Sequence, residues 1–209
     1  VDDLIENGSV VRGWLGVRHH DVYVPNSEDG YEVLTNRLKF PAHRVHMIKN
    51  GVDTDRFKAA DREHRPDPGA LGLPVTDHYA LIVSQARPEK RVEFLIDVAA
   101  EVFSRRPDLS LTFVAVGDGG RRPAWEVKVR DLGLERRFQI VGRQDDVVPF
   151  YQLATVFLHA ADRESFGNVT LEASSCGVPV ICSDVGGPRE IIEHGQAGYL
   201  LAKDDLNGF

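Results

Sequence analysis

The chain has 209 residues, of which 42% are hydrophobic and 27% are charged, as is typical of a soluble globular protein of one or two domains. Its net charge of −7 argues against nucleic acid or an anionic membrane as the main partner. No apolar run approaches the ~20 residues that a membrane-spanning helix needs, and the first residues lack the pattern of a signal peptide.

Residues 1–57 show a weak pattern of short elements. Strands are predicted at residues 21–24 and 45–48, and Ser27 is placed to cap a helix that runs through residues 31–38. Residues 58–76 are polar and rich in proline, which is typical of a linker between domains. The sequence therefore predicts that this stretch separates two parts of the chain.

From residue 77 onwards, strand and helix patterns alternate. Strands are predicted at residues 78–83, 109–116, 138–141, 156–159, 178–182 and 199–201. Helices are predicted at residues 92–106, 123–132, 147–153, 168–176 and from Pro188 onwards. This alternation predicts an α/β fold with a parallel sheet and helices on both faces, in which ligands bind at the carboxyl ends of the strands.

Two glutamates, Glu164 and Glu172, are separated by seven residues around the start of a predicted helix. Helix N-termini have unpaired N–H groups and a partial positive charge, which favour an anionic ligand such as phosphate. Carboxylates repel phosphate, so these two are better suited to accept hydrogen bonds from sugar hydroxyls. The pattern thus indicates a ligand with both phosphate and sugar hydroxyls. The alternatives are the acid/base pair of a hydrolase, or two exposed glutamates without a function.

The predicted loop after the first strand of this part carries three cations, Arg87, Lys90 and Arg91, at the start of a helix. Cations at this end of a helix interact unfavourably with the helix dipole. A bound diphosphate would remove this conflict, so the loop is a candidate phosphate-binding loop. The alternative is a solvated basic turn without a ligand.

Two other motifs are weaker. The glycine run at residues 117–120 lacks the third glycine of a dinucleotide-binding fingerprint, because that position is Arg122. A turn that lets a ligand approach closely is a milder interpretation of this run. His159 and Asp162 lie near Glu164 in the sequence, but their spacing is not that of a metal site, so we expect no bound metal.

The two cysteines, Cys176 and Cys182, flank an apolar turn and strand. This context favours buried, reduced thiols over a disulfide. Because reduced thiols are typical of the cytosol, we expect a cytoplasmic protein.

Several motifs together indicate a family. The segment ESFGNVTLEA at residues 164–173 is followed by GVPV at 177–180 and SDVGGPRE at 183–190, and NGVD at 50–53 precedes them. Residues 79–201 resemble the C-terminal, donor-binding domain of glycosyltransferase family 4, whose hallmark is a glutamate, seven residues and a second glutamate. Members of that family are retaining enzymes of the GT-B fold, which has two Rossmann-like domains.

The resemblance implies a division of the chain into three segments. Residues 1–57 would be a remnant of the N-terminal, acceptor-side domain with its crossover, residues 58–76 a linker, and residues 77–209 the Rossmann-like nucleotide-sugar donor-binding domain. Most of the acceptor-side domain and the final helices of the family have no counterpart here. We therefore expect the chain to be a fragment.

The resemblance also implies roles for individual residues. Glu164 would hold hydroxyls of the donor sugar near the reacting carbon, and Glu172 would bind the ribose hydroxyls of the nucleotide. Lys90 would neutralise the donor diphosphate, and Arg143 would lie near the base. Sugar and phosphate would also be held by the backbone at the start of the helix, formed by Phe166, Gly167, Asn168 and Val169.

The first loop departs from the family pattern Gly-Arg-Leu, for which this chain has Ser84-Gln85-Ala86. Gln85 therefore stands where the family has an arginine that binds the diphosphate. Arg87, two residues further on, is a candidate substitute. Without such a contact, transition-state stabilisation would fall by a few kcal/mol.

We therefore expect the donor-binding half of a retaining glycosyltransferase that uses a nucleotide-sugar and needs no essential metal or other cofactor. The half alone would be inactive. Its acceptor would be a sugar, lipid or small molecule and not nucleic acid, and the resemblance allows peripheral membrane association through the rest of the N-terminal domain. Two alternatives are a GT-B enzyme of the nucleotide-sugar 2-epimerase type and a non-catalytic nucleotide-sugar-binding module.

Overall fold

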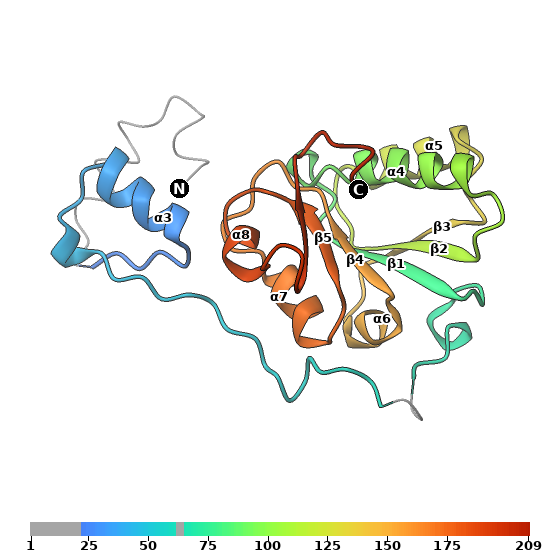
Figure 1. The fold of residues 1–209 in the computed structure, drawn as a ribbon, viewed down its shortest axis with the longest axis horizontal. Coiled ribbons are helices and arrows are strands. Elements are labelled where there is room, and N and C mark those ends of the chain that lie inside the picture. The colour runs from blue at the N-terminus through green and yellow to red at the C-terminus, as the bar shows by residue number, and fades with distance from the viewer. Residues whose placement is uncertain (1–21, 62–64) are drawn as a thin grey trace. The chain divides into compact units, whose positions relative to one another are not determined.

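The computed structural model describes residues 22–61 and 65–209 of the chain. The chain forms two compact units, Val1–Asn50 and Gly51–Phe209 (Figure 1). No helix in the described ranges is long and apolar enough to cross a membrane.

The first unit is built around α3, Glu28–Glu32, which continues as a π-helical turn over Val33–Arg37. Ser27 caps α3, because its Oγ accepts a hydrogen bond from the N–H of Gly30 at 3.1 Å. The helix predicted here is confirmed, although its second half has the wider hydrogen-bond pattern of a π-helix. Leu34 on this half belongs to a small core that it shares with Tyr23, Phe40 and Val45.

The two strands predicted in this unit are reduced to one parallel bridge between Tyr23 and Val45, so their prediction was wrong. The Tyr23 N–H donates to the carbonyl of Arg44 at 2.8 Å, and the His46 N–H donates to the carbonyl of Tyr23 at 2.9 Å. The pairing does not extend into a full ladder because Pro25 has no N–H to donate.

The second unit contains a six-stranded sheet in the order β3-β2-β1-β4-β5-β6, with every neighbouring pair parallel (Figure 1). The strands are β1 His78–Val83, β2 Leu111–Val116, β3 Phe138–Gly142, β4 Val156–His159, β5 Val180–Ser183 and β6 Gly198–Leu201. The chain moves outward from β1 to β3 and then returns to the other side of β1 with β4. The carboxyl ends of β1 and β4 therefore meet at the point where the strand order reverses, which is where open α/β sheets bind ligands.

Helices cover both faces of this sheet, which confirms the predicted fold class. Successive side chains of β1 point to opposite faces of the sheet. Tyr79 and Leu81 belong to the buried cluster on one face, and Ala80 and Ile82 belong to the cluster on the other. Helices α4 Val92–Arg105 and α5 Arg122–Asp131 pack on one side, and α6 Val148–Leu153, α7 Asn168–Ser175 and α8 Pro188–Ile191 lie on the other. Short 3-10 helices lie at Ala42–Arg44, Gly69–Leu71 and Pro88–Lys90.

The segment after Asn50 belongs structurally to the second unit. Phe57 and Leu73 are both buried in the cluster on the α6 and α7 side of the sheet, and the ring of Phe57 meets that of Tyr151 edge-on at a centroid distance of 6.0 Å. The observed division at Asn50 therefore lies earlier than the predicted end of the first segment at residue 57. The crossover and part of the linker are held by these apolar contacts.

Both cysteines are buried and unbonded to each other, as predicted. Burial raises the pKa of Cys176 to about 11 and that of Cys182 to about 12. Because both thiols are buried and uncharged, they contribute to packing as small apolar groups.

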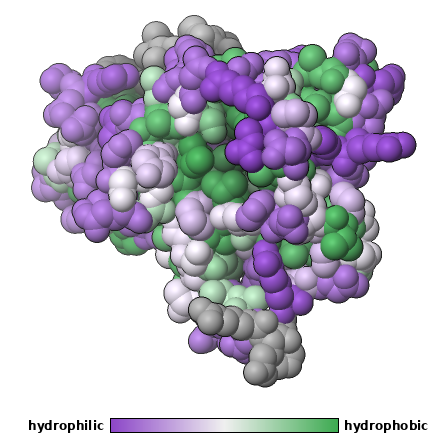
Figure 2. Space-filling view, turned by 45° about the vertical axis from the view of Figure 1, so that its right-hand side comes forward, coloured by the Kyte–Doolittle hydropathy of each residue, from purple (hydrophilic) through white to green (hydrophobic). Residues whose placement is uncertain are grey.

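Hydrophilic residues cover much of the face drawn in Figure 2, with smaller hydrophobic areas between them.

Candidate functional site

Lys90 and Glu164 meet at the point where the strand order reverses. Lys90 ends the 3-10 turn after β1, and Glu164 lies in the loop after β4. The Lys90 Nζ atom donates a hydrogen bond to Glu164 Oε2 at 2.7 Å. Their side chains are 21% and 15% exposed, so the ion pair is largely shielded from solvent but open on one side. The structure thus brings together the two residues predicted to act closest to the reaction.

His159 is a third member of this cluster. It is the last residue of β4, it is 3% exposed, and its Nε2 atom lies 3.1 Å from Glu164 Oε2. Burial opposes the charge on Glu164, but the hydrogen bonds from His159 and Lys90 and the charge of Lys90 outweigh this effect. Together they lower the pKa of Glu164 to about 2. Glu164 is therefore a carboxylate at neutral pH.

From the sequence, His159 was considered only as a metal ligand, and its contact with Glu164 was not predicted. The signal that could have found it is its position at the carboxyl end of β4, directly before the loop of Glu164. Asp162, the other residue considered for a metal, pairs instead with Arg91 at 3.4 Å and with Lys203 at 3.6 Å. In the described part of the chain, no three His, Cys, Asp or Glu side chains gather in a way that could hold a metal ion.

Glu172 lies in the second turn of α7, the helix that follows the loop of Glu164, and its side chain has a different partner. The Tyr151 hydroxyl, from α6, donates a hydrogen bond to Glu172 Oε2 at 2.8 Å. Burial raises the pKa of Glu172, while the Tyr151 hydrogen bond and the charge of Arg56 act in the opposite direction. Tyr151 and Arg56 were not singled out from the sequence, because neither is near Glu172 along the chain.

The start of α7 lies between the two glutamates. Gly167 has a left-handed φ of 92°, and a Cβ atom there would lie 2.6 Å from Thr170 Oγ1. This turn places Phe166 in the interior, at 4% exposure, and lets the helix begin at Asn168. Val169 is half-buried in the first turn. The first backbone N–H groups of α7 are therefore positioned beside the loop that carries Glu164.

A second glycine, Gly187 in the loop after β5, holds the loop that carries Glu164. The Gly187 N–H donates to the carbonyl of Glu164 at 3.1 Å. A Cβ atom on Gly187 would lie 2.1 Å from the backbone of Phe166, so no larger residue fits without moving one loop. The loops after β4 and β5 are thus packed backbone to backbone.

The loop that carries Lys90 is fixed in the same way by the loop after β2. The Ala86 N–H donates to the carbonyl of Asp118 at 2.9 Å, and the Arg121 N–H donates to the carbonyl of Ala86 at 3.0 Å. A Cβ atom on Gly117 would lie 1.8 Å from the carbonyl oxygen of Ser84. Gly117 and Gly119 of this run therefore make room for the neighbouring loop, and the close approach of a ligand to the run stays a prediction.

The remaining predicted residues lie further from the Lys90–Glu164 pair. Gln85 and Arg87 are exposed on the loop after β1, and a guanidinium nitrogen of Arg87 lies 3.9 Å from Glu89. Arg91 is held by Asp162 and by Asp204, the latter at 2.6 Å. Of the three cations in this loop, Lys90 is thus the one that faces Glu164.

Arg143 is exposed and directly follows β3, the edge strand of the sheet. Strand β2 separates β3 from β1, so Arg143 lies at the outer end of the row of loops. A ligand that reaches from Glu164 to Arg143 would have to extend along the carboxyl ends of several strands.

This arrangement combines an ammonium group, a helix N-terminus and two carboxylates at one edge of a parallel sheet. The ammonium and the N–H groups suit an anion such as phosphate. The ionised carboxylate of Glu164 suits hydroxyl donors. The site therefore matches a ligand that has both phosphate and hydroxyl groups.

Comparisons with known proteins agree with this chemistry. Residues 77–209 match the family model described as "Glycosyl transferases group 1". The chain is 33% identical over 174 residues to N-acetyl-alpha-D-glucosaminyl L-malate synthase of Bacillus anthracis, and the match covers 83% of this chain and 44% of that protein. It is 30% identical over 192 residues to D-inositol 3-phosphate glycosyltransferase of Rhodococcus erythropolis, covering 88% of this chain and 43% of that protein. The chain thus spans less than half the length of these curated relatives.

Solved structures show the same fold. Anabaena Alr3699/HepE in complex with UDP-glucose superimposes with a TM-score of 0.77 at 26% identity, over 90% of this chain and 52% of that one. TarM has a TM-score of 0.79 at 21% identity, over 97% of this chain and 37% of that one. Both likenesses extend over nearly the whole chain and about half or less of the other protein.

Proposed function

The chain belongs to the group 1 glycosyl transferases, the family whose model matches residues 77–209, and we propose that it is the nucleotide-sugar-binding half of a retaining enzyme. In the complete protein, the bond between the sugar carbon and the diphosphate oxygen breaks. An oxygen of an acceptor hydroxyl bonds to the same carbon, its proton passes to the departing diphosphate, and the configuration is retained. The acceptor is a sugar, lipid or small molecule that the rest of the protein binds.

The observation that carries this proposal is the contact between Lys90 and Glu164 at the reversal of strand order. We assign the Lys90 ammonium to the diphosphate and the Glu164 carboxylate to the hydroxyls of the transferred sugar. Glu172, on the other side of the α7 N-terminus, takes the ribose. The related Anabaena protein, whose structure contains UDP-glucose, supports this class of ligand.

The family match favours transfer over hydrolysis by an acid/base pair, and of the two glutamates only Glu172, whose pKa is raised by burial, suits the proton donor of such a pair. A glycosidase of that type needs one carboxyl group with a raised pKa that donates a proton to the leaving group. The pKa of Glu164 is about 2, because the hydrogen bonds from His159 and Lys90 outweigh the effect of burial. Glu164 therefore accepts hydrogen bonds and does not supply a proton at neutral pH.

The leaving diphosphate gains negative charge as its bond to the sugar breaks. A preformed cation and helix N–H groups lower the energy of that charge most strongly where water is limited. The Lys90 side chain is only 21% exposed, so little water surrounds its charge. Its ion pair with Glu164 already directs it into the site. We propose that these groups suffice without a metal, in which case a chelator leaves the activity of the complete enzyme unchanged.

Binding of nucleoside diphosphates to the 209-residue chain tests the proposal. Calorimetry with UDP, GDP and ADP should identify a nucleoside diphosphate that binds. Lys90→Met should lower the affinity for this nucleotide about tenfold or more, because its phosphate groups lose the cation that binds them. Lys128→Met is the matched control, since Lys128 makes a similar 2.6 Å ion pair with Asp97 between α4 and α5. Equal affinities for the Lys90→Met variant and the wild type would refute the assignment of Lys90.

A non-catalytic binding module is the second candidate, because the exposed Gln85 stands where the family pattern has an arginine. Arg87→Ala tests whether Arg87 takes over that contact, since the affinity for the diphosphate should then fall. The complete protein distinguishes the candidates further. Turnover of a nucleotide-sugar with retained configuration, followed by NMR of the product, supports the transferase. Binding without turnover supports the module, and a product with an inverted C2 centre supports an epimerase.

The cellular location is also a proposal. The two cysteines in the described part of the chain are unpaired and buried, which is typical of cytoplasmic proteins. We propose a cytoplasmic enzyme whose N-terminal domain reaches a membrane surface if the acceptor is a lipid. Fractionation of cells that express the complete protein tests this location.

A further inference from the structure

We propose that Tyr151 is a positioning residue for Glu172, and that its hydroxyl aims this carboxylate at the ribose hydroxyls of the nucleotide. This inference rests on the function proposed above, in which Glu172 binds the ribose. It assigns a task in substrate recognition to a buried tyrosine on α6, a helix that the predicted contacts with the ligand do not include.

The first observation is the hydrogen bond itself. The Tyr151 hydroxyl lies 2.8 Å from Glu172 Oε2 and 3.3 Å from the carbonyl oxygen of Val169. A phenol has one proton, and a charged acceptor at the shorter distance forms the stronger bond. The proton therefore goes to Glu172, which fixes one of its two carboxylate oxygens.

The second observation is that Glu172 depends on this donor. Among the described residues, Tyr151 is the hydrogen-bond partner found for its carboxylate, and Oε1 is left to accept bonds from a ligand. Burial favours the neutral form of Glu172, whereas the bond from Tyr151 and the charge of Arg56 favour the charged form. A charged carboxylate is the better acceptor for two hydroxyl groups. Tyr151 thus fixes one carboxylate oxygen of Glu172 and favours its charged form against the larger effect of burial.

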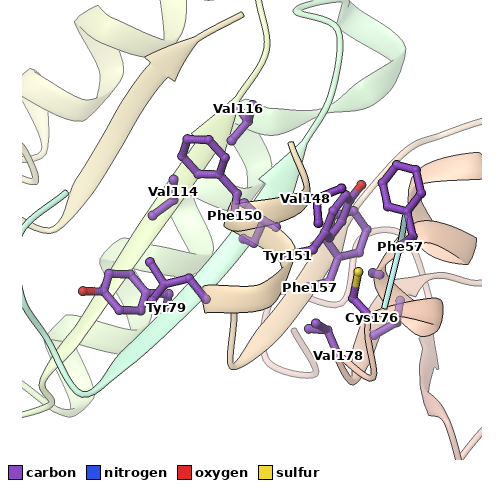
Figure 3. Packing of buried hydrophobic residues seen from close by; sticks show 14 of the residues in the cluster. Phe57, Tyr79, Val114, Val116, Val148, Phe150, Tyr151, Phe157, Cys176 and Val178 are labelled. Carbon is purple, nitrogen blue, oxygen red and sulfur yellow. The ribbon is translucent and has the colours of Figure 1, made fainter. Parts of the chain in front are cut away.

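The third observation is that Tyr151 is enclosed by other side chains. Its side chain is fully buried, and Figure 3 shows its ring packed among the side chains of Phe57 and Phe157. The centroid distances are 6.0 Å to Phe57 and 5.7 Å to Phe157. The backbone of Phe57 is in turn tied to α7, because Ser175 Oγ donates a hydrogen bond to its carbonyl oxygen. The hydroxyl is therefore presented to Glu172 from a rigid base.

A purely structural role would have different consequences. In that case the carboxylate would serve only to satisfy a buried phenol, and removal of the hydroxyl would lower stability without changing which nucleotides bind. The positioning role predicts a change in selectivity, because the contacts of Glu172 to the 2′- and 3′-hydroxyls weaken. The test must therefore compare ligands that differ only in these hydroxyls.

The experiment measures the affinity of the 209-residue chain for UDP, 2′-deoxy-UDP and 3′-deoxy-UDP by calorimetry, or for the corresponding GDP or ADP series if that nucleotide binds. We expect the wild type to bind the ribonucleotide about tenfold more tightly than at least one deoxy analogue. Tyr151→Phe should reduce this ratio to about threefold or less, mainly because the ribonucleotide binds more weakly. An unchanged ratio would overturn the inference.

Tyr79→Phe is the matched control. Tyr79 is also buried in the same cluster, and its hydroxyl donates to the carbonyl oxygen of Pro74 at 2.7 Å, near the start of β1. Its loss should lower the melting temperature without changing the ratio. A drop in the ratio for Tyr79→Phe as large as that for Tyr151→Phe would also overturn the inference, because a general loss of packing would then explain both.

A double-mutant cycle with Glu172→Gln sharpens the result. If Tyr151 acts through Glu172, then Tyr151→Phe should change the ratio little once Glu172 is already glutamine. If the effects of the two substitutions on the ratio were additive, this would contradict the inference.

Should Tyr151→Phe fail to fold, 3-fluorotyrosine at position 151 keeps the ring and makes the hydroxyl a stronger donor. The ratio should then rise and not fall. A ratio unchanged by fluorination would count against the proposal.

The outcomes separate this inference from the proposed function. If the wild type binds none of the nucleoside diphosphates, the proposed function fails. If it binds them but does not distinguish ribose from either deoxyribose, the function stands and the roles of Glu172 and Tyr151 are both refuted.

Discussion

Replacement of Glu164 with glutamine should change how the stability of the protein depends on pH. Burial opposes the charge on Glu164, but the hydrogen bonds from His159 and Lys90 outweigh it and lower the pKa from 4.5 to about 2. Because the pKa is lowered by folding, the stabilisation is complete above about pH 4.5 and is lost as the pH falls towards 2. The linkage relation gives a loss of about 2 kcal/mol between pH 5 and pH 3.

Urea unfolding of both proteins at several values between pH 5 and pH 3 measures this effect. The difference in unfolding free energy between wild type and Glu164→Gln should change by about 2 kcal/mol over that range. Asp97→Asn is the matched control, because Asp97 also pairs with a lysine at 2.6 Å, but its side chain is 44% exposed. That variant should follow the wild-type curve. Parallel curves for wild type and Glu164→Gln would show that His159 and Lys90 do not stabilise the charged form.

Two further predictions concern the scaffold of the site. Gly187→Ala should lower the unfolding free energy by about 2 kcal/mol or more, because the new Cβ would lie 2.1 Å from the backbone of Phe166. Gly120→Ala, which meets nothing within 4 Å, should change it by less than about 0.5 kcal/mol; urea unfolding that ranks the two variants the other way round would refute this. Burial raises the pKa of Cys176 to about 11 and of Cys182 to about 12, so iodoacetamide at pH 8 should modify neither thiol until the protein unfolds. Mass spectrometry checks this prediction, and fast labelling of the folded protein would contradict it.

The sequence predicts the sheet and its helices well where strong patterns are local. Strand β1 was predicted with its observed bounds, His78–Val83, because a run of apolar residues lies between polar ones. The helix start at Asn168 follows from the glycine before it. The two strands predicted around Tyr23 and Val45 failed, because a ladder needs N–H donors on both strands and Pro25 supplies none.

The site was predicted only in part, because its contacts join residues that are far apart in the sequence. Glu164 and Lys90 were recognised separately, but their 2.7 Å contact depends on β1 and β4 becoming neighbours in the sheet. Tyr151 has the sequence context of an ordinary buried helix residue. Nothing local in the sequence indicates that its hydroxyl faces Glu172. The assignment of Glu164 and Glu172 to sugar and ribose stays a prediction.

The loop that carries Lys90 has a consequence for how ligand preference can change. Its course around Gln85 and Arg87 is held by main-chain bonds at Ala86, by glycines on the neighbouring loop and by the ion pairs of Lys90 and Arg91. Gln85 and Arg87 are exposed on this frame, so we expect that their exchange leaves Lys90 in place. The residues that set the course of this loop are thus different from Gln85 and Arg87, the exposed residues that a ligand can contact. Such a separation lets new specificities evolve, or be engineered, one exposed side chain at a time.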